Sequence, residues 1–327
     1  MRRNRFLQQG FSLIELMIAA TLGLVIIGGV CALSLGTTRS YRVLSQASQQ
    51  IENGRYALSV LMGDLEHAGF MGQLAPSFAG LALPPALPDP CLTSSPPLKN
   101  LADSLLLPIT GTCGTSLAGK LTNTPALTLL RANSIGAPAA SIMAGNVYIQ
   151  TTPMQYIIGT MCTTNLTCSN FKSNQGTVSS FSLRQPSGIP ADLRQFHVHV
   201  YYLRAYSTQS GDNIPTLMRK SPADQDSNAQ PIVEGIENMQ FQYGVDDNGD
   251  GTPDRYTTTP SSVAEWSNVV TVRVSLLARS IDADYSRPAD TRSYNLGSLT
   301  VKPGGHYRRH VFSGVTRIVN VSARREE

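Results

Sequence analysis

Five residues that can offer oxygen ligands recur at every second position of one short stretch, which is a spacing suited to a metal ion. They are Asp246, Asn248, Asp250, Thr252 and Asp254. Gly251 stands at the sixth place, where an EF-type calcium loop turns sharply, and the seventh place supplies its backbone carbonyl. The four carboxylates within these nine residues also repel one another unless a cation or water offsets their charge. The stretch therefore predicts a calcium ion.

The same stretch departs from a complete calcium loop at its last place. Position 12 is Thr257, so the glutamate that binds calcium through both oxygens is missing. A solvated polar turn between two strands is the alternative interpretation, and it needs no metal. His197 and His199 would share one face of a strand, but no third ligand is evident, so we expect them at the surface or edge of a sheet.

Four cysteines beyond the first apolar run suggest two disulfide bonds in an oxidising compartment. They are Cys91, Cys113, Cys162 and Cys168, whereas Cys31 lies inside that run. Four cysteines allow three pairings. We expect Cys91 with Cys113 and Cys162 with Cys168, because each pair closes a local loop. Zinc is the competing interpretation, although this spacing does not resemble a zinc ribbon or finger.

No pattern of a known catalytic site occurs in the 327 residues. The chain has no nucleophile elbow, P-loop, dinucleotide-binding glycine motif or zincin motif, and its five histidines are scattered. The net charge is +4, and three of the arginines precede residue 10, so no basic face for a nucleic acid is expected. We therefore expect neither an enzyme nor a nucleic-acid-binding protein.

A glutamate near the start of the apolar run needs its own explanation. Residues 11–35 contain Glu15 and Cys31 as their only ionisable side chains, and a helix of this length exceeds a hydrocarbon core of about 30 Å. One membrane-spanning helix is therefore expected. The run has no proline, so a helix break would have to come from Gly28 and Gly29. A charged carboxylate in a bilayer costs about 2.5 to 3.5 kcal/mol, and a cationic partner would offset that cost.

Three interpretations of the N-terminus compete. A cleaved secretory signal has a shorter apolar segment with the small-residue site after it, and here the order is reversed. An uncleaved signal anchor explains the length and the preceding arginines but not Glu15. A cut between Gly10 and Phe11 would create an α-amine with a reference pKa of about 7.7 to 8.0. That amine could pair with Glu15 of the same molecule or of a neighbour.

The stretch G-F-S-L-I-E-L-M-I-A, residues 10–19, resembles the class III signal of type IV prepilins. The resemblance implies that a prepilin peptidase removes residues 1–10 as a leader by cutting after Gly10. It also implies that Phe11 is then N-methylated. In this family the carboxylate that corresponds to Glu15 pairs with the N-terminus of an adjacent subunit during filament assembly.

An amphipathic helix is expected to continue the apolar run. Small or apolar residues recur at alternating steps of three and four, with polar residues on the other side. The stripe comprises Leu44, Ala47, Ile51, Gly54, Leu58, Leu61, Leu65 and Ala68. Gly69 and Gly72 mark its end. We expect one helix over about 12–68, with 11–35 as the transmembrane and filament-core part and 36–70 as its amphipathic continuation.

Residues 71–327 have the pattern of a globular, β-rich head. Residues 71–125 hold nine of the 20 prolines and are interpreted as a long ordered loop, because proline is excluded from central strands. Strand patterns then recur at 126–132, 146–151, 154–159, 178–184, 196–205, 216–220, 236–245, 268–278 and 310–321. The expected fold class is α+β, with the long N-terminal helix packed on an antiparallel β-sheet.

Two further stretches resemble the PilW family of minor type IV pilins. They are V-E-G-I-E-N-M-Q-F-Q-Y-G-V-D-D-N-G-D-G-T-P-D-R-Y, followed by Trp266 and N-V-V-T-V-R-V-S-L-L-A-R-S, and Q-Q-I-E-N-G-R-Y-A-L-S-V-L-M-G-D-L-E-H-A-G-F. The resemblance implies a type IV pilin fold and a low-abundance subunit that joins other minor pilins in a complex that initiates pilus assembly. Implied partners are the major pilin, the prepilin peptidase, the inner-membrane assembly platform and a tip adhesin. The implied location is the inner membrane, crossed once, with a periplasmic head that reaches the pilus or cell surface after assembly.

Two other functions stay open at this point. A minor pseudopilin of type II secretion carries the same kind of N-terminal signal, but such subunits are usually shorter than this chain. An adhesin or other binding module on a pilin stem would use residues 73–229, where no resemblance is evident, as its binding part.

Overall fold

The structure, a computed structural model, describes residues 12–75, 80–87, 98–111, 117–138, 141–161, 171–174, 178–222 and 228–326. The expected prepilin cut and both expected disulfides fall on Gly10, Phe11, Cys91, Cys113, Cys162 and Cys168, which lie outside these residues and stay predictions. The chain divides into two compact units, residues 1–49 and residues 50–327. In its described part the first unit is helical throughout, apart from the residue that precedes the helix.

Helix α1 runs from Leu13 to His67 and confirms the expected long N-terminal helix. It continues through Gly28 and Gly29, so neither glycine breaks it. The absence of proline explains this continuity, since two glycines weaken a helix without removing a backbone donor. Gly69, with φ +76°, ends the helix in a left-handed conformation that suits glycine.

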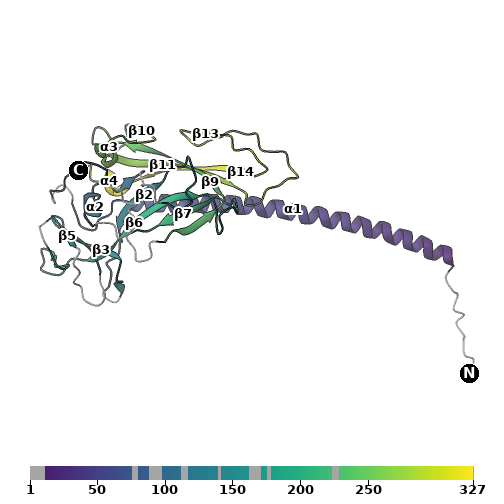
Figure 1. Ribbon diagram of the computed structural model, residues 1–327, viewed down its shortest axis with the longest axis horizontal. Helices are drawn as coiled ribbons and strands as arrows, with labels where there is room; N and C mark the ends of the chain where they lie inside the picture. The colour runs from purple at the N-terminus through teal and green to yellow at the C-terminus, as the bar shows by residue number, and fades with distance from the viewer. Residues whose placement is uncertain are drawn as a thin grey trace, which may run out of the picture. The chain divides into compact units, whose positions relative to one another are not determined.

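The larger sheet of the second unit has eight strands, all paired antiparallel. They are β1 (Ile109–Thr110), β2 (Leu127–Ala132), β3 (Val147–Thr151), β4 (Tyr156–Thr160), β5 (Phe171–Ser173), β6 (Leu193–Arg204), β7 (Thr216–Lys220) and β8 (Gln230–Glu234). Their order is β1-β2-β6-β3-β4-β5, with β7 between β6 and β8. The 12-residue β6 pairs with β2, β3 and β7 and is the central strand of this sheet (Figure 1).

A second antiparallel sheet has the order β10-β9-β11-β14. These strands are β9 (Ile236–Val245), β10 (Arg255–Thr257), β11 (Val269–Arg279) and β14 (Arg309–Arg317), and β12 (Tyr294–Asn295) pairs with β13 (Thr300–Val301) in a separate ribbon. Three short helices complete the described chain: α2 (Leu98–Asp103), α3 (Val263–Ser267) and α4 (Val319–Ser322). The expected α+β class is confirmed, but the head holds two larger sheets where the sequence pattern predicted one.

The strand predictions are confirmed with two exceptions. Residues 178–184 form no strand, and their only ladder contact is the bridge of Arg184 to Pro190. Their apolar side chains pack instead against Ile157 and Ala191. The alternating apolar pattern therefore reflects this packing and not the pairing of a strand. The prediction at 310–321 is right up to Arg317, after which the chain turns into α4.

One apolar core joins α1 to both sheets. Buried core residues of the helix are Ala57, Leu61, Leu65 and Ala68, and they cluster with Leu127, Leu129, Tyr201, Leu203, Val270, Val272, Val274 and Leu276. The predicted stripe is therefore correct over its second half. In its first half Leu44 and Ile51 are exposed, at 65% and 41%, whereas Gly54 is buried. The buried Ala57 was missing from the stripe.

Two glycines allow α1 and β14 to approach closely. A Cβ atom at Gly54 would overlap the ring of Phe312, and one at Gly314 would lie 2.6 Å from the sulfur of Met62. Each glycine thus faces a large side chain of the other element. Gly54 belongs to the helical stripe for this reason, although glycine disfavours a helix interior by about 1 kcal/mol.

A carboxylate on the last turn of α1, with only 11% of its side chain exposed, binds the larger sheet. Asp64 accepts hydrogen bonds from His199 Nδ1 at 2.5 Å, the Tyr201 hydroxyl at 2.7 Å and Arg131 Nε at 3.1 Å. Burial raises the pKa of Asp64, but the hydrogen bonds and charges of these partners lower it by a larger amount. The pKa of Asp64 therefore lies well below its ordinary value. His199 is buried on central strand β6, which corrects the expectation of a histidine at a surface or edge.

We predict that Asp64→Asn lowers the free energy of unfolding by about 3 kcal/mol at pH 7, because it leaves Arg131 without its buried counter-charge. The folded-state pKa of Asp64 is depressed, so its contribution is complete above about pH 4 and is lost as the pH falls toward the folded pKa. Urea unfolding of both proteins at pH 7 and pH 3 measures this. Glu66→Gln, on the exposed side of the same turn, is the matched control. Equal stabilities of wild type and Asp64→Asn at pH 7 would contradict the prediction.

Candidate assembly helix and aspartate loop

The part of α1 from Leu13 to Leu35 is apolar and exposed in the isolated chain. Large side chains stand out from it along its length, among them Leu13 at 79%, Leu24 at 71% and Leu35 at 72% exposure. By length and composition α1 is able to cross a membrane. An apolar surface of this extent needs a cover, either lipid or other apolar helices. Cys31, the one free cysteine in the described part of the chain, is exposed on this segment.

Glu15 lies in the first turn of α1 and closes a reciprocal cap with Ser12. The Ser12 N–H donates to Glu15 Oε2 at 3.0 Å, and the Ile14 N–H donates to Ser12 Oγ at 3.2 Å. These two bonds satisfy backbone donors that the helix itself leaves unpaired. The sequence carried the signal, S-L-I-E, but our interpretation of Glu15 by charge alone missed this capping role. A carboxylate at this end also interacts favourably with the helix dipole.

The first predicted calcium ligand, Asp246, is fully buried and already paired. Its carboxylate accepts from the backbone N–H of Gly249 at 2.6 Å and of Gly251 at 3.0 Å. Arg325 Nη1 donates to the same carboxylate at 3.0 Å. Burial raises the pKa of Asp246, but these donors outweigh it, so the pKa lies below its ordinary value. Gly251, with φ +81°, makes the sharp turn that the motif predicted.

The remaining predicted ligands form hydrogen bonds within the loop. Asp254 Oδ2 accepts from the backbone N–H of Asp247 at 2.8 Å and of Asn248 at 3.2 Å. The Asn248 amide donates to Asp250 Oδ2 and to Asp254 Oδ1, both at 3.2 Å. Asp250 Oδ1 accepts from the Thr252 N–H at 2.8 Å. All five predicted residues are thus brought into one loop.

The carboxylates of the loop already have hydrogen-bond partners within the chain, and this bears on calcium binding. In the described part of the chain, no group of three or more His, Cys, Asp or Glu is placed to hold a metal ion. The Asn248 amide nitrogen points at two carboxylates where a cation would sit, and Arg325 already pairs with Asp246. As folded here the loop is neutralised by the chain's own N–H groups and one guanidinium. Calcium stays a prediction, and it would have to displace these donors.

The C-terminal segment holds the loop and the end of α1 together. The Asn320 amide donates to Ala68 O at 3.1 Å, and Arg324 Nη2 donates to Gly69 O at 3.2 Å. Arg325 contacts both the backbone and side chain of Asp246 and also binds the Asn268 side chain. No local signal in the sequence marked Arg325, because its partners lie far away along the chain.

We predict that Arg325→Gln lowers the free energy of unfolding by about 3 kcal/mol, because the Asp246 carboxylate stays buried without its cation. Thermal or urea unfolding of the full chain in detergent would measure the loss. Arg287→Gln is the matched control, since Arg287 is an exposed arginine with no ion pair in the described part of the chain. An unchanged stability in Arg325→Gln would mean that the loop does not depend on this pair.

Comparisons with known proteins match both ends of the chain. Residues 200–320, which include the whole second sheet and the aspartate loop, match the family described as Type IV Pilus-assembly protein W. Residues 5–30, which include Glu15, match the prokaryotic N-terminal methylation motif. No curated protein matches the chain.

Among solved structures, a type IV-like pilin from Thermus thermophilus matches with a TM-score of 0.33 and 9% sequence identity. The match covers 86% of this chain and 98% of that one. The chain thus combines a region similar to the PilW family of type IV pilus-assembly proteins with a prepilin methylation motif at the start of its apolar helix.

Proposed function

We propose that this protein is a minor pilin that joins other minor pilins in the complex that initiates type IV pilus assembly. The observation that carries the proposal is Glu15, an acidic side chain in the first turn of an exposed apolar helix, inside a matched methylation motif. The match to a pilus-assembly family at the other end of the chain supports the same role.

The chemistry of the pairing follows from the charges. Removal of residues 1–10 by a prepilin peptidase would expose the α-amine of Phe11, which would then be methylated. A secondary amine formed in this way still carries a positive charge at neutral pH. In an apolar filament core, an ion pair between this amine and Glu15 of an adjacent subunit would prevent both charges from being desolvated without a partner. Because only one axial position brings the two groups together, the pair would set the register of the helices.

The Ser12 cap supports this role for Glu15. It uses Glu15 Oε2, and a carboxylate has further lone pairs that can accept from a neighbouring amine. The cap therefore holds the side chain at the helix end while leaving acceptor capacity free. Lipid would cover the apolar part of α1 before assembly, and the helices of other pilins would cover it afterwards.

The head would follow the helix into the filament, because the two are parts of one chain. Residues 50–67 of α1 belong to the same compact unit as both sheets, and Asp64 binds them to β2 and β6. The proposed location is therefore the inner membrane, crossed once, with a periplasmic head that reaches the pilus surface. The pilus machinery, namely major and minor pilins and the assembly platform, supplies the partners, and a tip adhesin is proposed as a further one.

Calcium at the aspartate loop is a separate proposal. Asp246, Asn248, Asp250, the Thr252 carbonyl and Asp254 would supply the oxygen ligands, and the turn at Gly251 supports this assignment. The exterior of a cell provides calcium at concentrations that suit weak loops of this type. Binding would require the Asn248 amide to turn its oxygen inward.

We predict that Glu15→Ala leaves the protein in the inner membrane but reduces surface pili by at least about tenfold, the factor that about 1.4 kcal/mol of lost pairing produces. Counting pili by electron microscopy, together with membrane fractionation, tests both parts. Glu52→Ala is the control, because Glu52 is an exposed acid of the same helix outside the apolar run. Normal piliation in a strain that carries only Glu15→Ala would argue against the assembly role.

Mass spectrometry of the same samples checks the processing step. The mature protein should begin with methylated Phe11 in both variants. A mature chain that still begins with Met1 would remove the basis for the pairing, whatever the pilus count.

For the loop, we predict that a hundredfold excess of calcium over its Kd stabilises the protein by about 2.7 kcal/mol relative to a chelator. This corresponds to a rise in Tm of roughly 5 °C for a chain of this size. Asp250→Ala should abolish the rise, since Asp250 is an exposed loop ligand whose loss leaves the buried Asp246 pair intact. Identical Tm values in calcium and in chelator would rule the site out.

A further inference from the structure

A long connection between β11 and β14 covers the face of the second sheet opposite α1. The connection contains β12 and β13, and Tyr294 and Leu296 pack there against Leu277 of β11 and Val311 of β14 (Figure 1). Leu276 and Phe312, the next register pair, pack on the α1 side. Side chains alternate across a strand, so the connection and the helix lie on opposite faces.

A polar cavity of about 260 Å³ opens within this connection. Arg287, Asp290, Arg292, His306 and Tyr307 contribute to its lining. Its two sides are joined by backbone, because the Asp290 N–H donates to Gly305 O at 2.6 Å. The walls are therefore built from two segments that hold each other in place.

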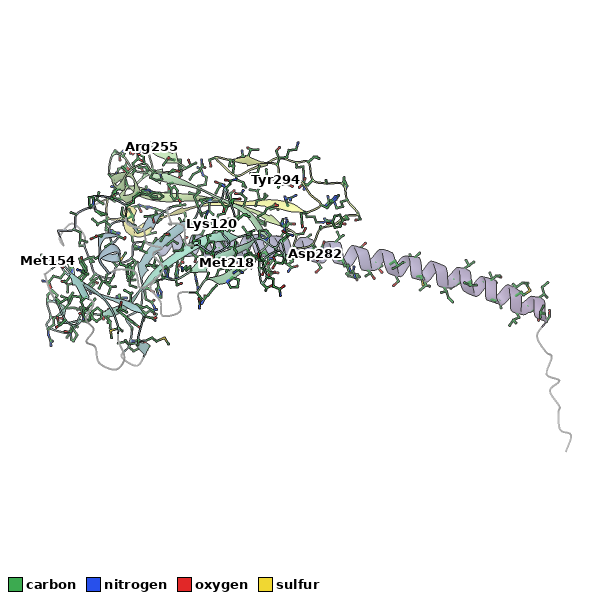
Figure 2. All side chains as sticks on the ribbon, viewed as in Figure 1. Lys120, Met154, Met218, Arg255, Asp282 and Tyr294 are labelled. Carbon is green, nitrogen blue, oxygen red and sulfur yellow. The ribbon has the colours of Figure 1, made fainter. Side chains whose placement is uncertain are left out.

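The one carboxylate of the lining is already neutralised. Asp290 accepts from the Tyr294 hydroxyl at 2.5 Å, from Arg292 Nε at 2.9 Å and from Arg309 Nη1 at 3.2 Å. Figure 2 labels Tyr294 within this part of the head. Burial raises the pKa of Asp290, but these donors lower it well below its ordinary value. Asp290 thus presents little free negative charge to the cavity.

Arg287 brings a further positive charge to the same cavity. In the described part of the chain no carboxylate lies within ion-pair distance of its guanidinium, and the nearby Asp284 pairs with Arg308 at 3.8 Å. His306 Nδ1 donates to the Arg287 carbonyl at 2.7 Å and so positions the backbone that carries this guanidinium. With Arg287 and Arg292 against Asp290, the lining has an excess of positive charge.

We propose that this cavity binds an oxyanion, a carboxylate or a phosphate group, through the guanidinium groups of Arg287 and Arg292. Arginine presents planar, paired donors that match the two oxygens of a carboxylate or phosphate. Arg292 uses Nε and Nη2 for Asp290, which leaves Nη1 available. The cavity has room for one such group with a few attached carbons. A free anion and a residue of another pilus subunit both offer this chemistry.

The test is calorimetric titration of the full chain in detergent with succinate and, separately, with inorganic phosphate. We expect saturable binding of at least one probe at one site per chain. Arg287→Gln should weaken this binding at least tenfold, and Arg287→Lys, which keeps the charge but loses the paired donors, should weaken it less. Lys302→Gln is the matched control, because Lys302 is an exposed cation of the same connection outside the cavity.

Each outcome bears on the proposal. Tighter binding of succinate would indicate a carboxylate source, and tighter binding of phosphate a phosphate source. The proposal is overturned if neither probe binds saturably, or if Arg287→Gln binds as tightly as wild type. It is also overturned if Lys302→Gln loses as much affinity as Arg287→Gln, since general charge attraction would then explain the binding. Circular dichroism of each variant confirms that the fold is kept.

Discussion

The docking of the second half of α1 between two sheets is the constraint on which the head depends. Ala57, Leu61 and Leu65 lie in one core with strands of both sheets, so a rotation of the helix would expose apolar area on either side. Apolar packing alone would allow small shifts of α1 against the sheets, because the hydrophobic effect is not directional. The Asp64 carboxylate removes that freedom, since its partners on β2 and β6 must be met together and a buried charge left unpaired is costly.

The same helix carries two kinds of surface for two different environments. Its buried residues near the C-terminal end are spaced to meet protein, and small residues such as Gly54 let β14 approach. Its apolar residues between Leu13 and Leu44 remain exposed, and only lipid or other helices can cover them. The helix therefore has one part that the head covers and one part that this chain leaves uncovered. Glu15 lies in the first turn of this uncovered part.

In two polar loops of the head, arginine side chains pair with the aspartate carboxylates. The aspartate loop has the spacing of a calcium loop, yet Arg325 from the C-terminal segment already pairs with Asp246. In the connection between β11 and β14, Arg309 and Arg292 likewise surround Asp290. At both of these aspartates the chain supplies its own guanidinium groups. Arg287 differs from these because its charge has no such partner in the described residues.

Local patterns in the sequence were enough to determine α1, most strands and the processing motif, because helical and strand periodicities depend only on near neighbours. The strand predicted over 268–278 is β11, and its Val270, Val272, Val274 and Leu276 are all buried. Periodicity did not reveal that the head has two sheets, that 178–184 packs without a ladder, or that His199 is buried. Those features, like the Arg325–Asp246 and Asp64–Arg131 pairs, join residues far apart in the chain. Only the tertiary structure decided them, because a long-range ion pair forms where folding brings two distant charges together. The residues next to each charge in the sequence carry no pattern that indicates its partner.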